Sequence, residues 1–158
     1  MQPSPSTFEA LFNEHGPPIR RFLRLWFRNS ATAEDLTQET FLHFWRRPTN
    51  FDPEKGALRS YLFGIARKKA ADWYERNKAP DEAAEEPSAP PVNLPILDAL
   101  ARLPEELRTA LWLREVEGYS YEELAVILNV PVGTVRSRLH TARQRLRKLW
   151  TNTEGQSL

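Results

Sequence analysis

Cysteine is absent from this chain of 158 residues, which excludes a disulfide framework and any metal site built on thiolates. The three histidines, His15, His43 and His140, are far apart in the sequence. A structural zinc ion usually needs four such ligands close together. The sequence therefore predicts no metal site and no other cofactor.

Long apolar runs are also missing. No stretch of about 18 apolar residues occurs, and the first residues, MQPSPSTFEALFNE, lack the basic-then-apolar layout of a secretion signal. Hydrophobic residues still make up 41% of the chain, enough to build helical cores. We expect a soluble cytoplasmic protein that does not insert into a membrane.

The net charge of +1 is too small to indicate a nucleic-acid partner, so the distribution of charge matters more. Residues 1–79 hold thirteen Lys and Arg against nine Asp and Glu. Residues 80–95 hold four acids, Asp81, Glu82, Glu85 and Glu86, and no base. Near the C-terminus, six basic residues lie between Arg136 and Lys148 with no acid among them. Two basic regions thus flank an acidic connector.

The connector also has a distinct composition. Residues 77–95 contain five prolines and only two large apolar residues, Val92 and Leu94, so they cannot bury a core. This composition predicts a flexible or extended linker. We expect a first domain at 1–77, a linker at 78–95, a second domain at 96–150 and a C-terminal tail at 151–158.

Both domains are predicted to be helical, because no segment shows the period-two alternation of a strand. In the first domain, Ser6 or Thr7 is a candidate N-cap, and Pro17 and Pro18 are expected to break or kink the path that follows. Further helices are predicted at 33–47 and 57–77, separated by a loop at 48–56. The fold class is therefore all-α, with two small helical domains.

The helix predicted at 33–47 has acids in its first turn and arginines in its last, as the helix dipole prefers. Phe41, Leu42, Phe44 and Trp45 cannot all face one core, because neighbours on a helix point about 100° apart. Either the helix is surrounded by its own bundle, or one side packs while the other, with Asp35, Gln38 and Glu39, contacts a partner protein.

The helix predicted at 57–77 mixes basic and aromatic residues. Basic groups neutralise phosphates and aromatic rings stack on unpaired bases, so this mixture suits single-stranded or melting DNA. Ordinary amphipathic packing, with aromatics in the core and charges in water, explains the same pattern.

The second domain carries a more specific pattern. Helices are predicted at 96–102 and 105–116, and Ser120 with Glu123 forms a capping box before a short helix that ends at Asn129. Residues 130–133 are expected to form a turn, and a long helix is expected to begin at Thr134. This spacing is typical of a helix-turn-helix.

The long helix also divides into faces. Val135, Leu139, Ala142, Leu146, Leu149 and Trp150 fall on one apolar stripe at about 100° per residue. Every basic residue lies off this stripe, which is what a recognition helix in the major groove requires. A solvated surface helix with no ligand is the alternative.

These segments also resemble a known family. FEALFNEHGPPIRRFLRLWF, AEDLTQETFLHFWRR and FDPEKGALRSYLFGIARKKAADWYERN resemble the successive parts of region 2 of sigma-70 factors. LPEELRTALWLREVEGYSYEELAVILNVPVGTVRSRLHTARQRLRKL resembles region 4. The two blocks, in this order and with no other sigma region recognisable, resemble the extracytoplasmic-function (ECF, group 4) sigma factors.

The resemblance implies a sigma factor that binds core RNA polymerase and promoter DNA and is not an enzyme. It implies polymerase contacts at Asp35, Gln38, Glu39, Leu42 and Trp45. It implies that the first domain recognises and melts the minus-ten element, through Asn50, Phe51, Asp52, Arg59, Arg67, Lys68 and Arg76, with a flipped base held by the first three.

The resemblance further implies that the second domain reads the minus-thirty-five element, through Thr134, Arg136, Ser137, Arg138, His140 and Arg143. Thr141 stands where members of the family often carry a basic residue, which removes one possible DNA contact. An anti-sigma factor is the expected regulatory partner, and the acidic linker is expected to enter the polymerase channel.

Three other classes explain less of the sequence. A regulator with a helix-turn-helix output would account for 96–150 but not for 33–77. An enzyme acting on nucleic acid would need a metal or acid-base cluster, and no spacing of Asp, Glu or His indicates one. A purely protein-binding helical module would show no salt-dependent promoter recognition when polymerase is present.

Overall fold

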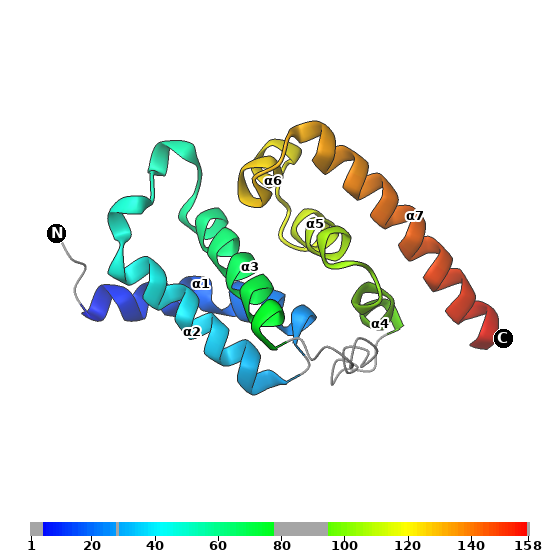
Figure 1. The fold of residues 1–158 in the computed structure, drawn as a ribbon, viewed down its shortest axis with the longest axis horizontal. Coiled ribbons are helices and arrows are strands. Elements are labelled where there is room, and N and C mark those ends of the chain that lie inside the picture. Colours follow the sequence, from blue (N-terminus) through cyan, green and yellow to red (C-terminus); the bar gives the residue numbers. More distant parts are fainter. Residues whose placement is uncertain (1–4, 28, 78–94, 158) are drawn as a thin grey trace. The chain divides into compact units, whose positions relative to one another are not determined.

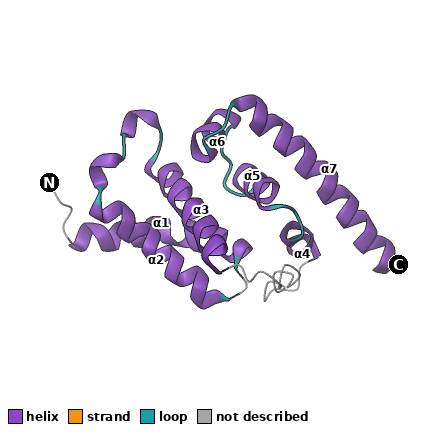
Figure 2. Cartoon of the chain, in the orientation of Figure 1, coloured by secondary structure: helices purple, strands orange, loops and turns teal. Residues whose placement is uncertain are grey.

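The structure is a computed structural model that describes residues 5–27, 29–77 and 95–157. All regular secondary structure in these ranges is helical, as the sequence predicts (Figure 2). The chain divides into two compact units, Met1–Glu86 and Pro87–Leu158, here called unit 1 and unit 2. The predicted linker lies outside the described residues except for Pro95, where the first helix of unit 2 begins.

Unit 1 is a bundle of three α-helices, α1 (Pro5–Trp26), α2 (Ser30–Arg46) and α3 (Leu58–Asn77), each of which contacts the other two (Figure 1). Two short 3₁₀ helices, η1 (Pro48–Asn50) and η2 (Pro53–Lys55), lie between α2 and α3. Large apolar side chains from all three helices fill the core because each helix buries one stripe. Its fully buried members include Ile19, Phe22, Leu23, Phe41, Leu62 and Phe63.

Pro17 and Pro18 lie inside α1 and do not break it, so of the predicted break or kink the break does not occur. The helix is continuous from Pro5 to Trp26. Each proline removes one backbone donor and crowds the preceding turn. Packing offsets this cost, because Ile19, Phe22 and Leu23 directly after the prolines are buried against the other helices. The same continuity makes the predicted N-cap at Ser6 or Thr7 wrong, since both residues follow the first helical residue.

The start of α2 also differs from the prediction. The helix begins at Ser30, three residues early, because the Asn29 side chain accepts a hydrogen bond from the Ala31 backbone N–H at 2.9 Å. Glu34 and Asp35 consequently lie beyond the first turn, which contains no acid. The predicted dipole match therefore holds only at the C-terminal end, where His43 and Arg46 lie in the last turn.

Unit 2 consists of α4 (Pro95–Ala101), α5 (Glu105–Glu115), α6 (Tyr121–Leu128) and α7 (Val132–Ser157), and α7 packs against the other three (Figure 1). Arg108 is 6% exposed within this core. Its Nη1 donates to the carbonyls of Ala101 and Leu103, at 3.3 Å each, so it satisfies acceptors at the end of α4.

The helix-turn-helix is α6, a short turn and α7. Both halves of the predicted capping box form: Glu123 N–H donates to Ser120 Oγ at 3.1 Å, and Ser120 N–H donates to Glu123 Oε1 at 2.9 Å. Asn129 ends α6 in the left-handed conformation with φ 54°, which asparagine tolerates better than most residues.

The turn is shorter than predicted and α7 is longer. Val132 and Gly133, expected in the turn, lie in the first turn of α7, because the Pro131 carbonyl accepts from Thr134 and Val135 and starts the helix there. The helix continues to Ser157, through most of the segment expected as a C-terminal tail.

Candidate functional sites

The α2 helix has one buried and one exposed face. Its buried residues are Ala33, Leu36, Thr37, Thr40, Phe41 and Phe44. Asp35, Gln38 and Glu39 are exposed, and Leu42 is 39% exposed. The helix is therefore not surrounded by its own bundle. Trp45 is half-buried and packs edge-on against Phe8 of α1, with ring centroids 4.8 Å apart.

An ion pair fixes α2 on α1. Arg20 donates to Glu34 through two hydrogen bonds, Nε to Oε2 at 2.5 Å and Nη2 to Oε1 at 3.2 Å. Hydrogen bonding to Arg20 lowers the pKa of Glu34, and nearby Gln38 contributes a smaller shift in the same direction. A bidentate pair restricts rotation as well as separation. It thus sets the orientation of the exposed face one turn away.

The loop after α2 holds the three residues expected to capture a base. Asn50 and Asp52 are exposed and Phe51 is half-buried. The Phe51 ring lies 5.3 Å from Tyr61 and 6.2 Å from Phe44, centroid to centroid. Asp52 caps η2, because its Oδ1 accepts from Glu54 N–H at 3.0 Å. The ring contacts of Phe51 and the cap formed by Asp52 therefore hold the loop in place, while Asn50 and Asp52 remain exposed to solvent.

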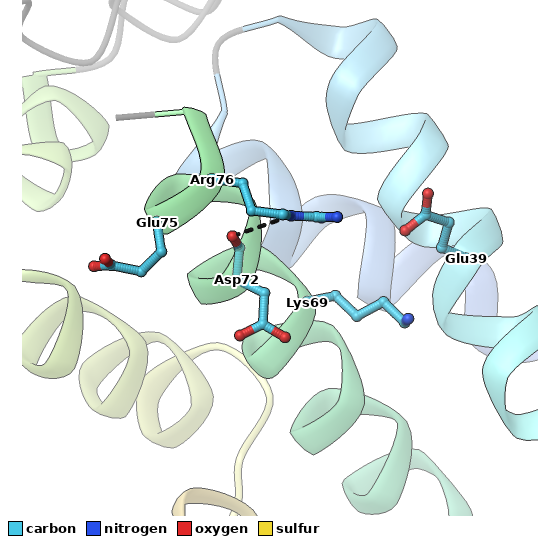
Figure 3. Close-up of a pocket in the computed structure, with 5 residues that line it drawn as sticks. All are labelled: Glu39, Lys69, Asp72, Glu75 and Arg76. Atoms are coloured by element: carbon cyan, nitrogen blue, oxygen red, sulfur yellow. Dashed lines mark hydrogen bonds between the residues drawn. The ribbon is translucent and has the colours of Figure 1, made fainter. Parts of the chain in front are cut away.

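The four basic residues of α3 expected at DNA do not lie in one kind of environment. Lys68 and Arg76 are exposed, and Arg76 Nε donates to the Asp72 carbonyl at 3.4 Å (Figure 3). Arg67 is half-buried. Arg59 faces α1, where Nε donates to His15 Nδ1 at 3.1 Å and Nη2 to the Glu14 carbonyl at 3.4 Å. Only part of the predicted set is thus open to a ligand.

Two aromatic residues of α3 pack instead of facing solvent freely. Trp73 lies edge-on to Phe27 at 5.0 Å, and Tyr74 stacks on the same ring at 5.2 Å. Tyr74 Oη also donates to the Trp26 carbonyl. These rings therefore pack against α1, although Trp73 is only half-buried and Tyr74 is still 37% exposed.

The faces of α7 match the prediction in the first half of the helix. Val135, Leu139 and Ala142 are fully buried and seat the helix on unit 2. Arg136, Ser137 and His140 are exposed, and Thr134 is half-buried at the N-terminal end. Ser137 Oγ donates to the Thr134 carbonyl at 3.1 Å, so its hydroxyl oxygen can still accept.

Two arginines predicted to read DNA contact the protein itself. Arg143 Nη2 lies 2.9 Å from Glu115 Oε1, and Nη1 donates to Tyr121 Oη at 3.4 Å. The bond to Tyr121, followed by the bond to Glu115, raises the pKa of Arg143, and the bond from Arg143 lowers the pKa of Tyr121. Arg138 Nη2 lies 3.9 Å from Glu106 Oε2. Both arginines therefore help to hold α7 against α5 and α6.

Sequence reasoning missed a basic groove in unit 1. A hollow of about 550 Å³ between α2 and α3 is lined by Glu39, Leu42, His43, Arg46, Arg47 and Lys69. We call it the α2–α3 groove. A neighbouring hollow shares Glu39 and Lys69 and extends toward Asp72, Glu75 and Arg76 (Figure 3). The run of basic residues at the end of α2 was the available signal.

Two absences concern only the described part of the chain. There, no helix has the length and apolar character needed to cross a membrane. In the same residues, no three His, Cys, Asp or Glu side chains gather in a way that could hold a metal ion.

Two family descriptions match most of this chain. Residues 11–79 match Sigma-70 region 2, and residues 93–146 match Sigma-70, region 4. The first match begins at residue 11, inside α1, and covers the rest of α1 together with α2 and α3. The second covers the helix-turn-helix with α4 and α5.

Individual proteins are similar over nearly the whole chain. RNA polymerase sigma factor CarQ of Myxococcus xanthus is 34% identical over 90% of this chain and 88% of its own. ECF RNA polymerase sigma factor SigL of Mycobacterium tuberculosis is 33% identical over 87% and 85%. A solved structure of the sigma factor RpoE with the anti-sigma factor NepR from Bartonella quintana matches with a TM-score of 0.72 and 27% identity, over 90% of this chain and 96% of that one.

Proposed function

This chain belongs to the sigma-70 family of RNA polymerase sigma factors, and we propose how its two units share promoter recognition. It binds core RNA polymerase and directs promoter-specific transcription initiation. Sigma factors are not catalytic enzymes, so the chemistry belongs to the polymerase. We further propose that it acts in the cytoplasm, where the polymerase and the DNA are.

The exposed face of α2 is proposed to bind the clamp helices of the polymerase. The observation that supports this most is the division of α2 between a packed face and an exposed face carrying Asp35, Gln38 and Glu39 around the apolar Leu42. An apolar residue ringed by polar groups is typical of an interface centre. Trp45, half-covered by Phe8, extends this face.

The loop at Asn50–Asp52 is proposed to hold a flipped base of the minus-ten element. Extruding a base costs a few kcal/mol, which contacts in the loop must offset. Exposed Asn50 and Asp52 offer polar groups to a base edge, and Phe51 offers a ring already fixed by Tyr61. Lys68 and Arg76 are proposed to contact the melted DNA, with Arg67 beside them, and Arg59 to act through its contact with α1.

Unit 2 is proposed to place α7 in the major groove of the minus-thirty-five element. Arg136, Ser137 and His140 are exposed on the N-terminal half of α7, and Thr134 lies beside them. Arginine can bind guanine with two hydrogen bonds, and serine and threonine can contact bases or phosphates. Arg138 and Arg143 are proposed to fix the angle of α7 through Glu106 and Glu115.

We also propose an anti-sigma factor as a regulatory partner. The RpoE structure that this fold matches contains one. The partner would have to cover the exposed face of α2, because that face is proposed to bind polymerase.

Run-off transcription tests this proposal. Core polymerase and fragmented genomic DNA are combined with the protein, with the variant Asp35→Ala/Gln38→Ala, or with the control Glu9→Ala/Asn13→Ala, whose residues are exposed on α1. New transcripts should start at discrete sites with wild type and control and disappear with the α2 variant. Absence of new start sites with wild type would contradict the proposed function.

A further inference from the structure

The proline pair at 17–18 divides α1 into two halves, of which residues 5–16 are here called the N-terminal half. Because proline has no backbone N–H, the pair removes the donors that the carbonyls of Asn13 and Glu14 would have in an uninterrupted helix. Arg59 of α3 replaces one donor, since its Nη2 donates to the Glu14 carbonyl at 3.4 Å. Tertiary contacts therefore do part of the work of holding the N-terminal half in line.

Aromatic contacts hold the N-terminal half on α2. The Phe8 ring lies edge-on to Trp45 with centroids 4.8 Å apart, and the Phe12 ring lies edge-on to Phe41 with centroids 5.0 Å apart. Phe41 is fully buried, whereas Trp45 is half-buried and belongs to the face of α2 proposed to bind polymerase. A shift of the N-terminal half would therefore move the support of the Trp45 ring.

A side-chain contact to α3 holds the same half of α1. Arg59 Nε donates to His15 Nδ1 at 3.1 Å, and the His15 side chain is only 13% exposed, so water competes little for this bond. His15 follows Phe8 by seven positions and Phe12 by three, a spacing that places the three side chains on one helix face. The contact with Arg59 and the aromatic contacts thus fix one face of one half-helix.

This contact requires a neutral imidazole. His15 Nδ1 accepts a hydrogen bond from Arg59, and a protonated ring has no acceptor and would place two cations opposite each other. Burial, followed by Arg59, lowers the pKa of His15, whereas Glu14 opposes the shift. Glu14 Oε2 lies 3.9 Å from His15 Nε2 and its side chain is 68% exposed, so it offers the charged ring a partner away from Arg59. The contact between α1 and α3 is therefore lost in acid.

We propose that His15 and Arg59 are positioning residues for polymerase binding. They hold the N-terminal half of α1 in place across the proline pair, and Phe8 in turn holds Trp45 in the exposed face of α2. This inference rests on the proposed binding of polymerase by that face. It predicts that polymerase affinity falls when the His15 ring is protonated.

Binding of the full-length protein to immobilised core polymerase tests the inference. Affinity is measured between about pH 8 and pH 5.5, where histidine titrates, for wild type, Arg59→Met and the matched control Arg24→Met, whose residue is exposed on α1. His15→Asn supplies an amide oxygen near the position of Nδ1 and does not titrate. Phe8→Ala and Phe8→Ala/Arg59→Met test the route through Trp45. Thermal melts at each pH confirm that every variant is folded.

At pH 8, Arg59→Met should bind polymerase roughly fivefold more weakly than wild type, and Arg24→Met should match wild type. The pH profiles of Arg59→Met and His15→Asn should be flatter than that of wild type, because neither variant has the titrating contact. Groups of the polymerase titrate too, but they are common to all variants. Phe8→Ala/Arg59→Met should bind about as well as Phe8→Ala alone, since both changes release the same ring, whereas a contact that only stabilises the fold would give additive losses.

Three results would overturn the inference. Equal affinity of Arg59→Met and Arg24→Met would show that Arg59 does not position the face. The same acid loss in His15→Asn as in wild type would exclude His15, and additive losses in the double variant would exclude the route through Phe8. Failure of the proposed function looks different, because wild type would then not bind core polymerase, or would bind it no more tightly than Asp35→Ala/Gln38→Ala.

Discussion

Arg59 Nε on α3 donates to His15 Nδ1 on α1 at 3.1 Å. Its Nη2 also donates to the Glu14 carbonyl, at 3.4 Å. In an uninterrupted helix that carbonyl would accept from the residue four positions later, but Pro18 has no N–H to donate. The guanidinium thus supplies a donor that the helix lost, and it joins α1 to α3 at the proline pair.

Loss of this contact should destabilise unit 1. Arg59→Met keeps much of the side-chain length but removes every donor, which should cost about 1–2 kcal/mol of unfolding free energy. The measurement is amide hydrogen exchange of peptides from α1 and α3, with Arg24→Met, exposed on α1, as the control. Equal exchange in the two variants would show that Arg59 contributes nothing to the junction.

The same contact predicts a pH dependence of stability. Burial first, then Arg59, lowers the pKa of His15 below 6.5, while Glu14 opposes the shift. The folded state therefore favours neutral His15, whose contribution is complete above pH 6.5 and is lost as the pH falls through the lower folded pKa. Unfolding free energy should fall between pH 7.5 and 5, and less steeply in His15→Asn.

His43 has a lowered pKa as well and contributes with the same sign. Its contribution is common to wild type and His15→Asn, so the difference between the two profiles isolates His15. Parallel profiles would contradict the role given to His15.

We expect the Arg143–Glu115 pair to contribute to the stability of unit 2, whereas we expect Arg136 to contribute to DNA binding. The side chains of Arg143 and Glu115 are both about half exposed, so a double-mutant cycle should give a coupling of only about 0.5 kcal/mol in the stability of unit 2.

Arg136→Ala should weaken promoter binding more than Arg143→Ala and relax the preference for one base pair. The measurement is binding of holoenzyme to a promoter mapped by run-off transcription. A larger loss of base preference in Arg143→Ala would instead assign that residue to direct readout.

The capping box should determine part of the stability of unit 2. Ser120→Ala removes the acceptor for Glu123 N–H and should cost about 1 kcal/mol, whereas Ser120→Thr keeps a hydroxyl and should cost less. Denaturant unfolding followed by tryptophan fluorescence measures both. Equal losses in the two variants would mean that the hydroxyl is not the stabilising group.

Several features could be predicted because they depend on local chemistry. The box at Ser120 and Glu123, the end of α6 at Asn129 and the buried stripe of α7 need only a few neighbouring residues. The family resemblance likewise depends on motifs along the chain, and the comparisons confirmed it. The assignment of individual residues to polymerase or DNA remains a prediction, to be tested as described.

The tertiary structure decided what depends on residues distant in sequence. Helix α1 continues through Pro17 and Pro18 because residues of α2 and α3 pack around it and Arg59 replaces a donor. Arg143 is bound by Glu115, 28 positions away, so its sequence pattern alone could not separate a DNA contact from a structural one. The α2–α3 groove exists only where Lys69 meets the end of α2. Local propensity and periodicity are encoded in consecutive residues, whereas partners and surfaces arise only when helices pack.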